Sequence, residues 1–156
     1  MSGYRIELLA KHEREGFSCG SAPLDRYFQL QVTQDIRRRI ASCFVAVSTI
    51  GDVAGFYTLA ATSLAFDRLA PERAKKLPHY PVVPAILLGR LAVATSHQRK
   101  QLGVALVTDA LLRSTRSDIA AHMMVVDAKD AAAIAFYGRL GFERLPDDPS
   151  RLIRAL

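Results

Sequence analysis

Residues 87–105 read LLGRLAVATSHQRKQLGVA and contain the local features that decide the fold. The stretch begins with mostly apolar residues, which are typical of a buried strand. A short basic loop follows, and a helix is expected to open at 101–103. The first N–H groups of a helix have no intrahelical acceptor, and its macrodipole places partial positive charge there. The stretch therefore predicts a strand, an anion-binding loop and a helix in succession.

Residues 130–142 read DAAAIAFYGRLGF and carry a second informative pattern. They predict a short helix over 130–139, followed by Gly141 and a strand from about 142. Tyr137 falls near the end of this helix. An anion-binding loop followed by a tyrosine on a later helix indicates an enzyme that handles a phosphorylated acyl carrier.

The hydropathy pattern of the whole chain predicts one mixed α/β (α+β) domain over residues 1–156. Ser21 is a candidate N-cap, and Gly51-Asp52 is a candidate hairpin turn. The elements predict a central sheet of six to seven strands flanked by about four helices. Besides the helix over 130–139 and the last strand, strands are expected at 4–9, 42–50, 53–63, 85–94 and 122–128, and helices at 23–39, 67–80 and 101–116.

Composition limits the classes of protein to which the chain can belong. Half of its 156 residues are hydrophobic, so an intrinsically disordered chain is not expected. No apolar run approaches the ~18 residues that a membrane span needs, and residues 1–17 do not form a secretory signal. Cys19 and Cys43 lack metal-ligand spacing and are expected to be buried thiols. These features favour a cytoplasmic protein with no metal and no membrane segment.

The formal net charge of +6 favours an anionic partner, such as nucleic acid, an acidic protein or the phosphates of a cofactor. The alternative is that the excess charge only keeps an ordinary basic enzyme in solution. Each cation could likewise be part of a solvated face, and Arg90 could form either a phosphate contact or a simple salt bridge. The candidate contacts to nucleic-acid phosphates are Arg37, Arg38, Arg39, Arg73, Lys75, Lys76 and Arg90, with Arg99 and Lys100 beside them.

The two patterns resemble the motifs of the GNAT family of N-acetyltransferases, in order and over nearly the whole chain. The family's pyrophosphate loop is written (Gln/Arg)-x-x-Gly-x-(Gly/Ala), and its later motif is written (Asn/Asp)-x-x-Ala-x-x-x-Tyr. In this chain the first motif falls on Gln98, Gln101 and Gly103, and the second falls on Asp130, Ala133 and Tyr137.

A narrower resemblance is to the acetyltransferase toxins of bacterial toxin–antitoxin pairs. It is carried by the phrases FSCGSAPLDRYF, VAGFYTLAATS, LPHYPVVPAILLGRLAV, VVDAKDAAAIAFYGRLGF and PSRL. The resemblance implies acetyl-CoA as cofactor, charged tRNA as acetyl acceptor, a block of translation, a ribbon-helix-helix antitoxin and a homodimer. The residues themselves leave other acceptors open, namely a small amine, an antibiotic or a protein N-terminus. They also leave open a cofactor-binding module with weakened activity.

The resemblance also implies a set of site residues. Tyr137 is the candidate general acid for the CoA sulfur, and the alternative is a tyrosine that only packs in the core. Asp130 is expected to cap its helix in preference to contacting the cofactor. Residues 91–93 would offer backbone groups to the pantetheine arm. The expected cofactor contacts are Leu91, Ala92, Val93, Gln98, Arg99, Lys100, Gln101, Leu102, Gly103, Val104, Ala105, Asp130, Ala133 and Phe136.

One departure from the family pattern concerns the pyrophosphate loop. The family has glycine where this chain has Gln101, and the toxin group usually has glycine at Arg99 as well. Glycine permits positive φ and a close approach of the backbone to phosphate. With ordinary helical dihedral angles, Gln101 would still donate its N–H, while its side chain would narrow the site. Arg99 and Lys100 would partly compensate by adding charge, so we expect acetyl-CoA binding weaker than in relatives.

Overall fold

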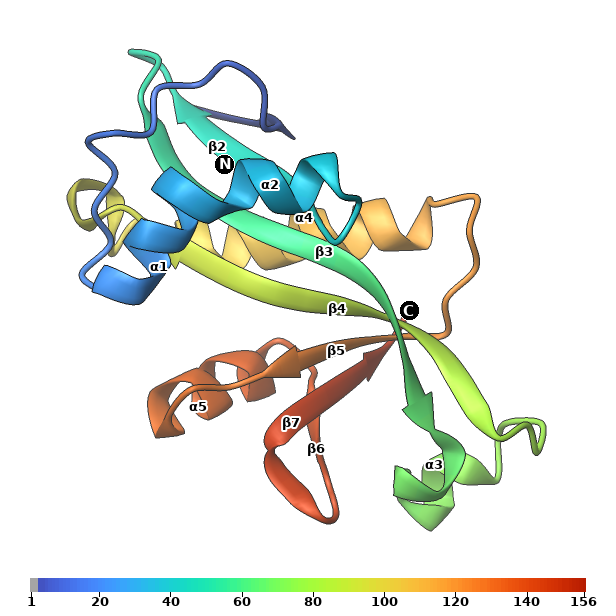
Figure 1. Ribbon diagram of the computed structural model, residues 1–156. Helices are drawn as coiled ribbons and strands as arrows, with labels where there is room; N and C mark the ends of the chain where they lie inside the picture. Colours follow the sequence, from blue (N-terminus) through green and yellow to red (C-terminus); the bar gives the residue numbers. More distant parts are fainter. Residues whose placement is uncertain (1–2) are drawn as a thin grey trace. The chain divides into compact units, whose positions relative to one another are not determined.

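The computed structural model describes residues 3–156 and contains one mixed sheet (Figure 1). Its strands are β1 (Tyr4–Leu8), β2 (Ser42–Ser48), β3 (Val53–Ala65), β4 (Val82–Val93), β5 (Met123–Asp127), β6 (Glu143–Leu145) and β7 (Asp148–Ala155). Their spatial order is β1-β2-β3-β4-β5-β7-β6. The strands β4 and β5 pair in parallel, whereas β1–β2, β2–β3, β5–β7 and β6–β7 pair antiparallel. The predicted mixed sheet of six to seven strands is confirmed.

The helices are α1 (Ala22–Arg26), α2 (Val32–Arg37), α3 (Pro71–Ala74), α4 (Leu102–Thr115) and α5 (Ala131–Arg139). No helix within residues 3–156 combines the length and the apolar content that a membrane crossing requires. The chain divides into two compact units. The first contains the residues up to Ala60 together with Gly89–Leu112, and the second contains Ala61–Leu88 and Arg113–Leu156.

The helix predicted over 23–39 is present, but its hydrogen-bond spacing changes in the middle. Ser21 caps its start as predicted, because its side chain accepts from the N–H of Leu24. A π-helical turn at Tyr27–Gln31 then joins α1 to α2. The guanidinium of Arg14 donates to the carbonyl oxygen of Phe28, within this turn, at 2.6 Å. Single π-helical turns are rare in proteins, and those that occur often lie at functional sites. The segment Tyr27–Gln31 is therefore a candidate part of the functional site.

Aromatic side chains fill the space between α1–α2 and one face of the sheet in the first unit. The rings of Phe28 and Phe56 stack with centroids 4.3 Å apart, and Phe17 packs edge-on against both. The helix α4 covers the other face (Figure 1). There a Cβ on Gly55 would lie 2.9 Å from the carbonyl oxygen of Ala92. Glycine at position 55 therefore lets β3 and β4 approach closely beneath α4.

The second unit is built around β5. Residues 123–126 are fully buried, as predicted for a central strand that is covered on both faces. They pair with β4 on one side and β7 on the other. The last segment, predicted as one strand from about 142, is instead a hairpin of β6 and β7.

The helix predicted over 67–80 is wrong in length. The structure has a 3₁₀ turn at Phe66–Arg68 and then α3, which ends at Ala74. Pro71 suits the first helical position, where no N–H is needed. Pro78 and the further prolines at 81 and 84 cannot continue a helix, and they favour extended backbone before them. Consistent with this, β4 begins at Val82, earlier than predicted.

Candidate functional site

Side-chain hydrogen bonds hold the start of the loop between β4 and α4 in place. A 3₁₀ turn at Thr95–His97 follows β4. The side-chain amide of Gln98 then donates to the carbonyl oxygens of Val93 at 3.0 Å and Cys19 at 3.1 Å. The side chain of Gln98, the first residue of the predicted loop motif, therefore stabilises the start of the loop. The expected cofactor contact of Gln98 remains a prediction.

The backbone of the loop is left-handed at two residues that are not glycine. Arg99 has a φ of 64° and Gln101 a φ of 60°. Side chains clash with the backbone in this region, at a cost of roughly 1–2 kcal/mol per residue. The family pattern has glycine at position 101, and the toxin group usually has glycine at position 99. The premise of ordinary helical angles at Gln101 is therefore wrong, because the loop keeps the glycine conformation without the glycine.

Consecutive backbone N–H groups are left without acceptors where α4 begins. Among residues 3–156, the N–H groups of residues 99–104 donate to no protein group, and the next one, of Ala105, donates to the carbonyl oxygen of Gln101 at 3.2 Å. We refer to residues 99–104 as the amide cradle. The side chains of Arg99 and Lys100 are exposed beside it. Donors of this kind at the positive end of a helix suit a pyrophosphate.

The strand β4 extends well past its stretch of pairing with β5. That pairing covers residues 85–88, and β4 continues to Val93. Residues 91–93 belong to this extension and to the first unit, as the amide cradle does. The side chain of Ala92 is buried, and the carbonyl oxygen of Val93 accepts from Gln98. The expected backbone contacts of residues 91–93 to a pantetheine arm remain a prediction.

The helix α5 carries Tyr137 in the second unit. Asp130 caps this helix as expected, because its carboxylate accepts from the N–H of Ala133 at 2.8 Å. The Tyr137 ring packs edge-to-face against Phe136 and Phe142, with centroids 5.1 and 5.5 Å away. Burial raises the pKa of Tyr137 to about 12. The described part of the chain offers its hydroxyl no hydrogen-bond partner, so the phenol is a protonated donor with no structural task.

Comparison with known proteins identifies the family. The model of the acetyltransferase (GNAT) domain matches residues 39–144. A protein of Mycobacterium tuberculosis (strain ATCC 25618 / H37Rv) named tRNA-acetylating toxin is 35% identical over 157 residues, which cover 98% of this chain and 93% of that protein. The chain belongs to the GNAT acetyltransferase family. It is therefore an acetyl-CoA-dependent N-acetyltransferase, and the family and enzyme class identified from the sequence are confirmed.

Two solved GNAT structures resemble the chain over nearly its full length. AtaT complexed with acetyl-methionyl-tRNAfMet has a TM-score of 0.88 and 26% identity, covering 97% of this chain and 94% of that one. AtaTR bound with AcCoA has a TM-score of 0.81 and 27% identity, covering 99% of this chain and 95% of that one. The resemblance to GNAT toxins seen in the sequence is thus confirmed.

Arg90 does not form the salt bridge that was one of its two expected contacts within residues 3–156, and the expected phosphate contact remains a prediction. Its guanidinium carbon lies 3.7 Å from the centroid of the Tyr27 ring, which indicates stacking on the ring face. The hydroxyl of Tyr27 donates to Asp35 at 2.8 Å. Burial, followed by this bond to Asp35, raises the pKa of Tyr27. Within residues 3–156, Arg90 forms no ion pair, and its guanidinium stacks on the Tyr27 ring. The guanidinium can therefore still bind an anion.

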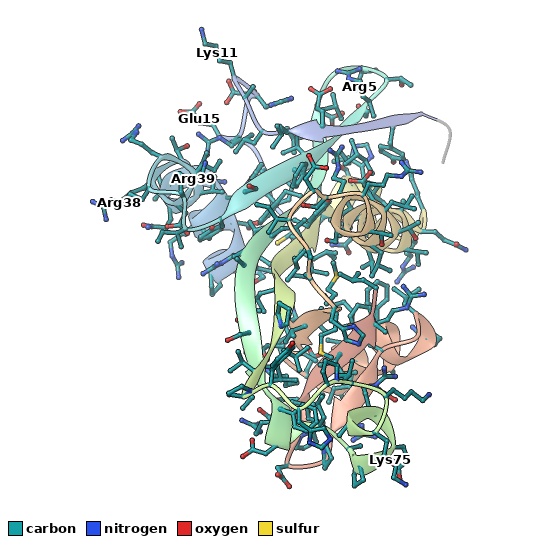
Figure 2. The ribbon with its side chains drawn as sticks, turned by 90° about the vertical axis from the view of Figure 1, so that its right-hand side faces the viewer. Arg5, Lys11, Glu15, Arg38, Arg39 and Lys75 are labelled. Atoms are coloured by element: carbon teal, nitrogen blue, oxygen red, sulfur yellow. The ribbon has the colours of Figure 1, made fainter. Side chains whose placement is uncertain are left out.

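The other candidate cations fall into two groups. Arg37, Arg38 and Arg39 are exposed at the end of α2, and Figure 2 shows Arg38 pointing away from the helix. Arg73 forms an ion pair with Glu143, which supports a structural role for it. Lys75 and Lys76 are exposed after α3, in the second unit. The arginines at the end of α2 and Arg90 therefore belong to the first unit, whereas α3 and the lysines after it belong to the second.

Proposed function

We propose that this GNAT enzyme transfers the acetyl group of acetyl-CoA to the α-amino group of an aminoacyl-tRNA and acts as the toxin of a toxin–antitoxin pair. The observation that carries the proposal is the amide cradle. It provides donors for a pyrophosphate at the position where the family motif lies. The substrate class is suggested by the relative named tRNA-acetylating toxin, and by AtaT complexed with acetyl-methionyl-tRNAfMet.

The cofactor contacts divide between the backbone and the cations of the first unit. The N–H groups of residues 99–104 would hold the pyrophosphate, and Arg99 and Lys100 would add positive charge. The backbone of residues 91–93 would pair with the pantetheine arm. Bound acetyl-CoA supplies an activated thioester, so the protein has to orient it and provide a proton for the sulfur.

Tyr137 is the residue that we assign to that proton. Because burial raises its pKa to about 12, the phenol stays protonated throughout the neutral range. Its hydroxyl needs no rearrangement before it donates, since no group in residues 3–156 accepts from it. The raised pKa of Tyr137 also makes the phenol a weak acid. Its hydroxyl would therefore first donate a hydrogen bond to the developing thiolate and transfer the proton afterwards.

The chemistry of the acceptor agrees with an aminoacyl group. An α-amino group has a pKa near 7.7–8.0, so on the order of a tenth of it is already neutral at pH 7. A lysine side chain, near 10.4, would require a strong general base. In the described part of the chain, the carboxyl groups with displaced pKa values are all displaced downward, and none is poised as such a base. They are Glu7, Asp52 and Asp148.

Exposed cations would bind the tRNA. Contacts between proteins and nucleic-acid backbones are largely electrostatic, so the arginines of α2 and Arg90 would provide affinity without selecting a sequence. Lys75, Lys76 and Arg73 are further candidates. Two partners complete the proposal. One is a ribbon-helix-helix antitoxin, whose acidic, partly disordered tail would cover these cations. The other is a second copy of the chain, in a homodimer in the cytoplasm.

Mass spectrometry of total aminoacyl-tRNA, incubated with the protein and acetyl-CoA, tests the proposal. We expect a mass increase of one acetyl group on the aminoacyl moiety, and no acetylation of a panel of free amines and protein N-termini under the same conditions. Acetylation of the panel with unchanged aminoacyl-tRNA would overturn the proposed substrate. Loss of the product in the Tyr137→Phe variant would connect the reaction to this site.

A further inference from the structure

We propose that His97 is a positioning residue for the cofactor, which holds the entry of the amide cradle against the end of the sheet formed by β1, β2 and β3. The inference rests on the proposed function, because it takes residues 99–104 as the pyrophosphate site. His97 itself does not belong to the GNAT motif, and it lies just before Gln98, where that motif begins.

Both ring nitrogens of His97 are engaged by residues that are distant in sequence. Its Nδ1 lies 2.8 Å from the hydroxyl of Tyr4, and its Nε2 lies 3.0 Å from Oδ2 of Asp52. A carboxylate can only accept, so Nε2 donates to Asp52. The rings of His97 and Tyr4 also meet edge-to-face, with centroids 5.6 Å apart. The histidine side chain is only 12% exposed.

The partners of His97 are themselves fixed. Tyr4 lies directly opposite Ser48 in the pairing of β1 with β2. The hydroxyl of Ser48 donates to the carboxylate of Asp52 within the turn between β2 and β3. This bond, and next the His97 ring, lower the pKa of Asp52, so the carboxylate is ionised and a good acceptor. His97 is therefore attached to β1 and to the turn between β2 and β3, at one end of the part of the sheet that these strands form.

The cradle needs such an attachment because its backbone is strained. Arg99 and Gln101 both lie in the left-handed region, which side chains other than that of glycine occupy at a cost. Strained residues persist only where their surroundings over-determine them. Gln98 holds the loop through two carbonyl oxygens. The preceding residue, His97, is held by the bonds of its ring to Tyr4 and Asp52. Without the histidine bonds, the loop can relax, and its N–H groups would no longer be held in place for an anion.

A pair of matched variants tests this role. His97→Phe keeps an aromatic ring and removes both hydrogen bonds. His12→Phe is the control, because His12 is also engaged at both nitrogens, by Glu7 and by the N–H of Ala10, and its side chain is 14% exposed. We measure the Kd of acetyl-CoA by calorimetry, and kcat and KM with charged tRNA. His97→Phe should raise the Kd and KM for acetyl-CoA about tenfold with kcat unchanged, and His12→Phe should change none of them.

The outcomes separate this inference from the proposed function. If the wild-type protein does not bind acetyl-CoA, both are overturned. If the wild type binds it and His97→Phe binds equally well, or loses only kcat, the positioning role is overturned and the proposed function stands. An equal loss in the His12→Phe control would also overturn it, because the effect would then be general destabilisation.

Two further variants keep the test decisive if His97→Phe does not fold. Tyr4→Phe removes only one hydroxyl and should raise the Kd of acetyl-CoA by a smaller factor, about threefold. Gln101→Gly, combined with either change, should recover most of the lost affinity, because glycine adopts positive φ without strain. If the affinity lost by Tyr4→Phe is not recovered by Gln101→Gly, loop strain is not the link between this cluster and the cofactor.

Discussion

The guanidinium of Arg90 lies on the ring of Tyr27, with its central carbon 3.7 Å from the ring centroid. The ring belongs to the π-helical turn between α1 and α2, and its hydroxyl is bound to Asp35. Arg90 is on β4, and its own N–H donates to the side chain of Thr58 at 3.0 Å. A cation on a rigid strand and a rigid ring loses little side-chain entropy when it binds a phosphate. The contact therefore prepares Arg90 for an anionic substrate.

We expect Arg90→Ala to lower kcat/KM for charged tRNA about tenfold and to leave the Kd of acetyl-CoA unchanged. Arg90→Lys should recover only part of the loss, because an ammonium group does not stack on the ring as a guanidinium does. Steady-state kinetics with varied tRNA and saturating acetyl-CoA measures the effect. Wild-type kinetics in Arg90→Ala would show that the stacked cation serves only the fold.

Arg99 and Gln101 give a prediction about stability. Replacing either residue with glycine removes the strain of a side chain on a left-handed backbone. It also increases the backbone entropy of the unfolded chain. The balance of the two effects favours the folded state by about 0.5–1 kcal/mol. Urea unfolding at 25 °C should show a higher midpoint for Arg99→Gly and for Gln101→Gly.

Lys100→Gly is the matched control for that measurement. Lys100 lies between the two strained residues and does not have a positive φ. Glycine there adds entropy to the unfolded chain without relieving strain, so the midpoint should fall. A fall in all three variants would mean that the left-handed conformations cost the chain nothing.

Tyr137→Phe separates catalysis from packing. The ring contacts with Phe136 and Phe142 survive the change, and the lost hydroxyl has no partner in the structure of residues 3–156. We expect the free energy of unfolding and the Kd of acetyl-CoA to stay the same, and kcat to fall at least ~10²-fold. Rapid-quench measurement of acetyl transfer gives the rate. Retention of the wild-type rate would remove Tyr137 from the mechanism.

The raised pKa of Tyr137 also predicts how stability depends on pH. Its folded value of about 12 lies above the ordinary value of 10.0, so the folded state favours the protonated phenol. This contribution is complete below pH 10 and is lost as the pH rises from 10 to 12. Cys43, whose pKa burial raises to about 12, behaves in the same way from pH 9 upward. The unfolding free energy of Tyr137→Phe should therefore fall less steeply than that of the wild type between pH 10 and 12.

The elements that carry the candidate site follow from local sequence signals. Ser21 and Asp130 cap their helices as predicted, because a capping side chain and the backbone N–H that donates to it lie within one helical turn. The apolar run of β5 likewise predicts a central strand. The error in the length of α3 also has a local cause, because Pro78 and the prolines at 81 and 84 favour extended backbone.

The contacts that shape the cradle and Arg90 were beyond prediction because they are not local. Tyr4 and His97 are 93 residues apart, and no periodicity connects them. The positive φ of Arg99 and Gln101 has no signal in the residue types, which normally avoid it. Only the family's glycines at these positions pointed to the left-handed conformation. The residues therefore predicted the elements, whereas the expectation of ordinary helical angles at Gln101 was wrong.

The arginines at the end of α2 give a prediction about how the affinity for tRNA depends on salt concentration. Each phosphate contact contributes about 0.7–0.9 to the slope of log Kd against log salt concentration. Arg38→Gln with Arg39→Gln should weaken tRNA binding and reduce the slope by between about 1 and 2. Arg5→Gln with Lys11→Gln removes the same charge elsewhere in the first unit (Figure 2) and should leave the slope unchanged. Equal losses of slope in the two double variants, measured by filter binding from low to physiological salt, would mean that net charge alone attracts the tRNA and that α2 is not its binding surface.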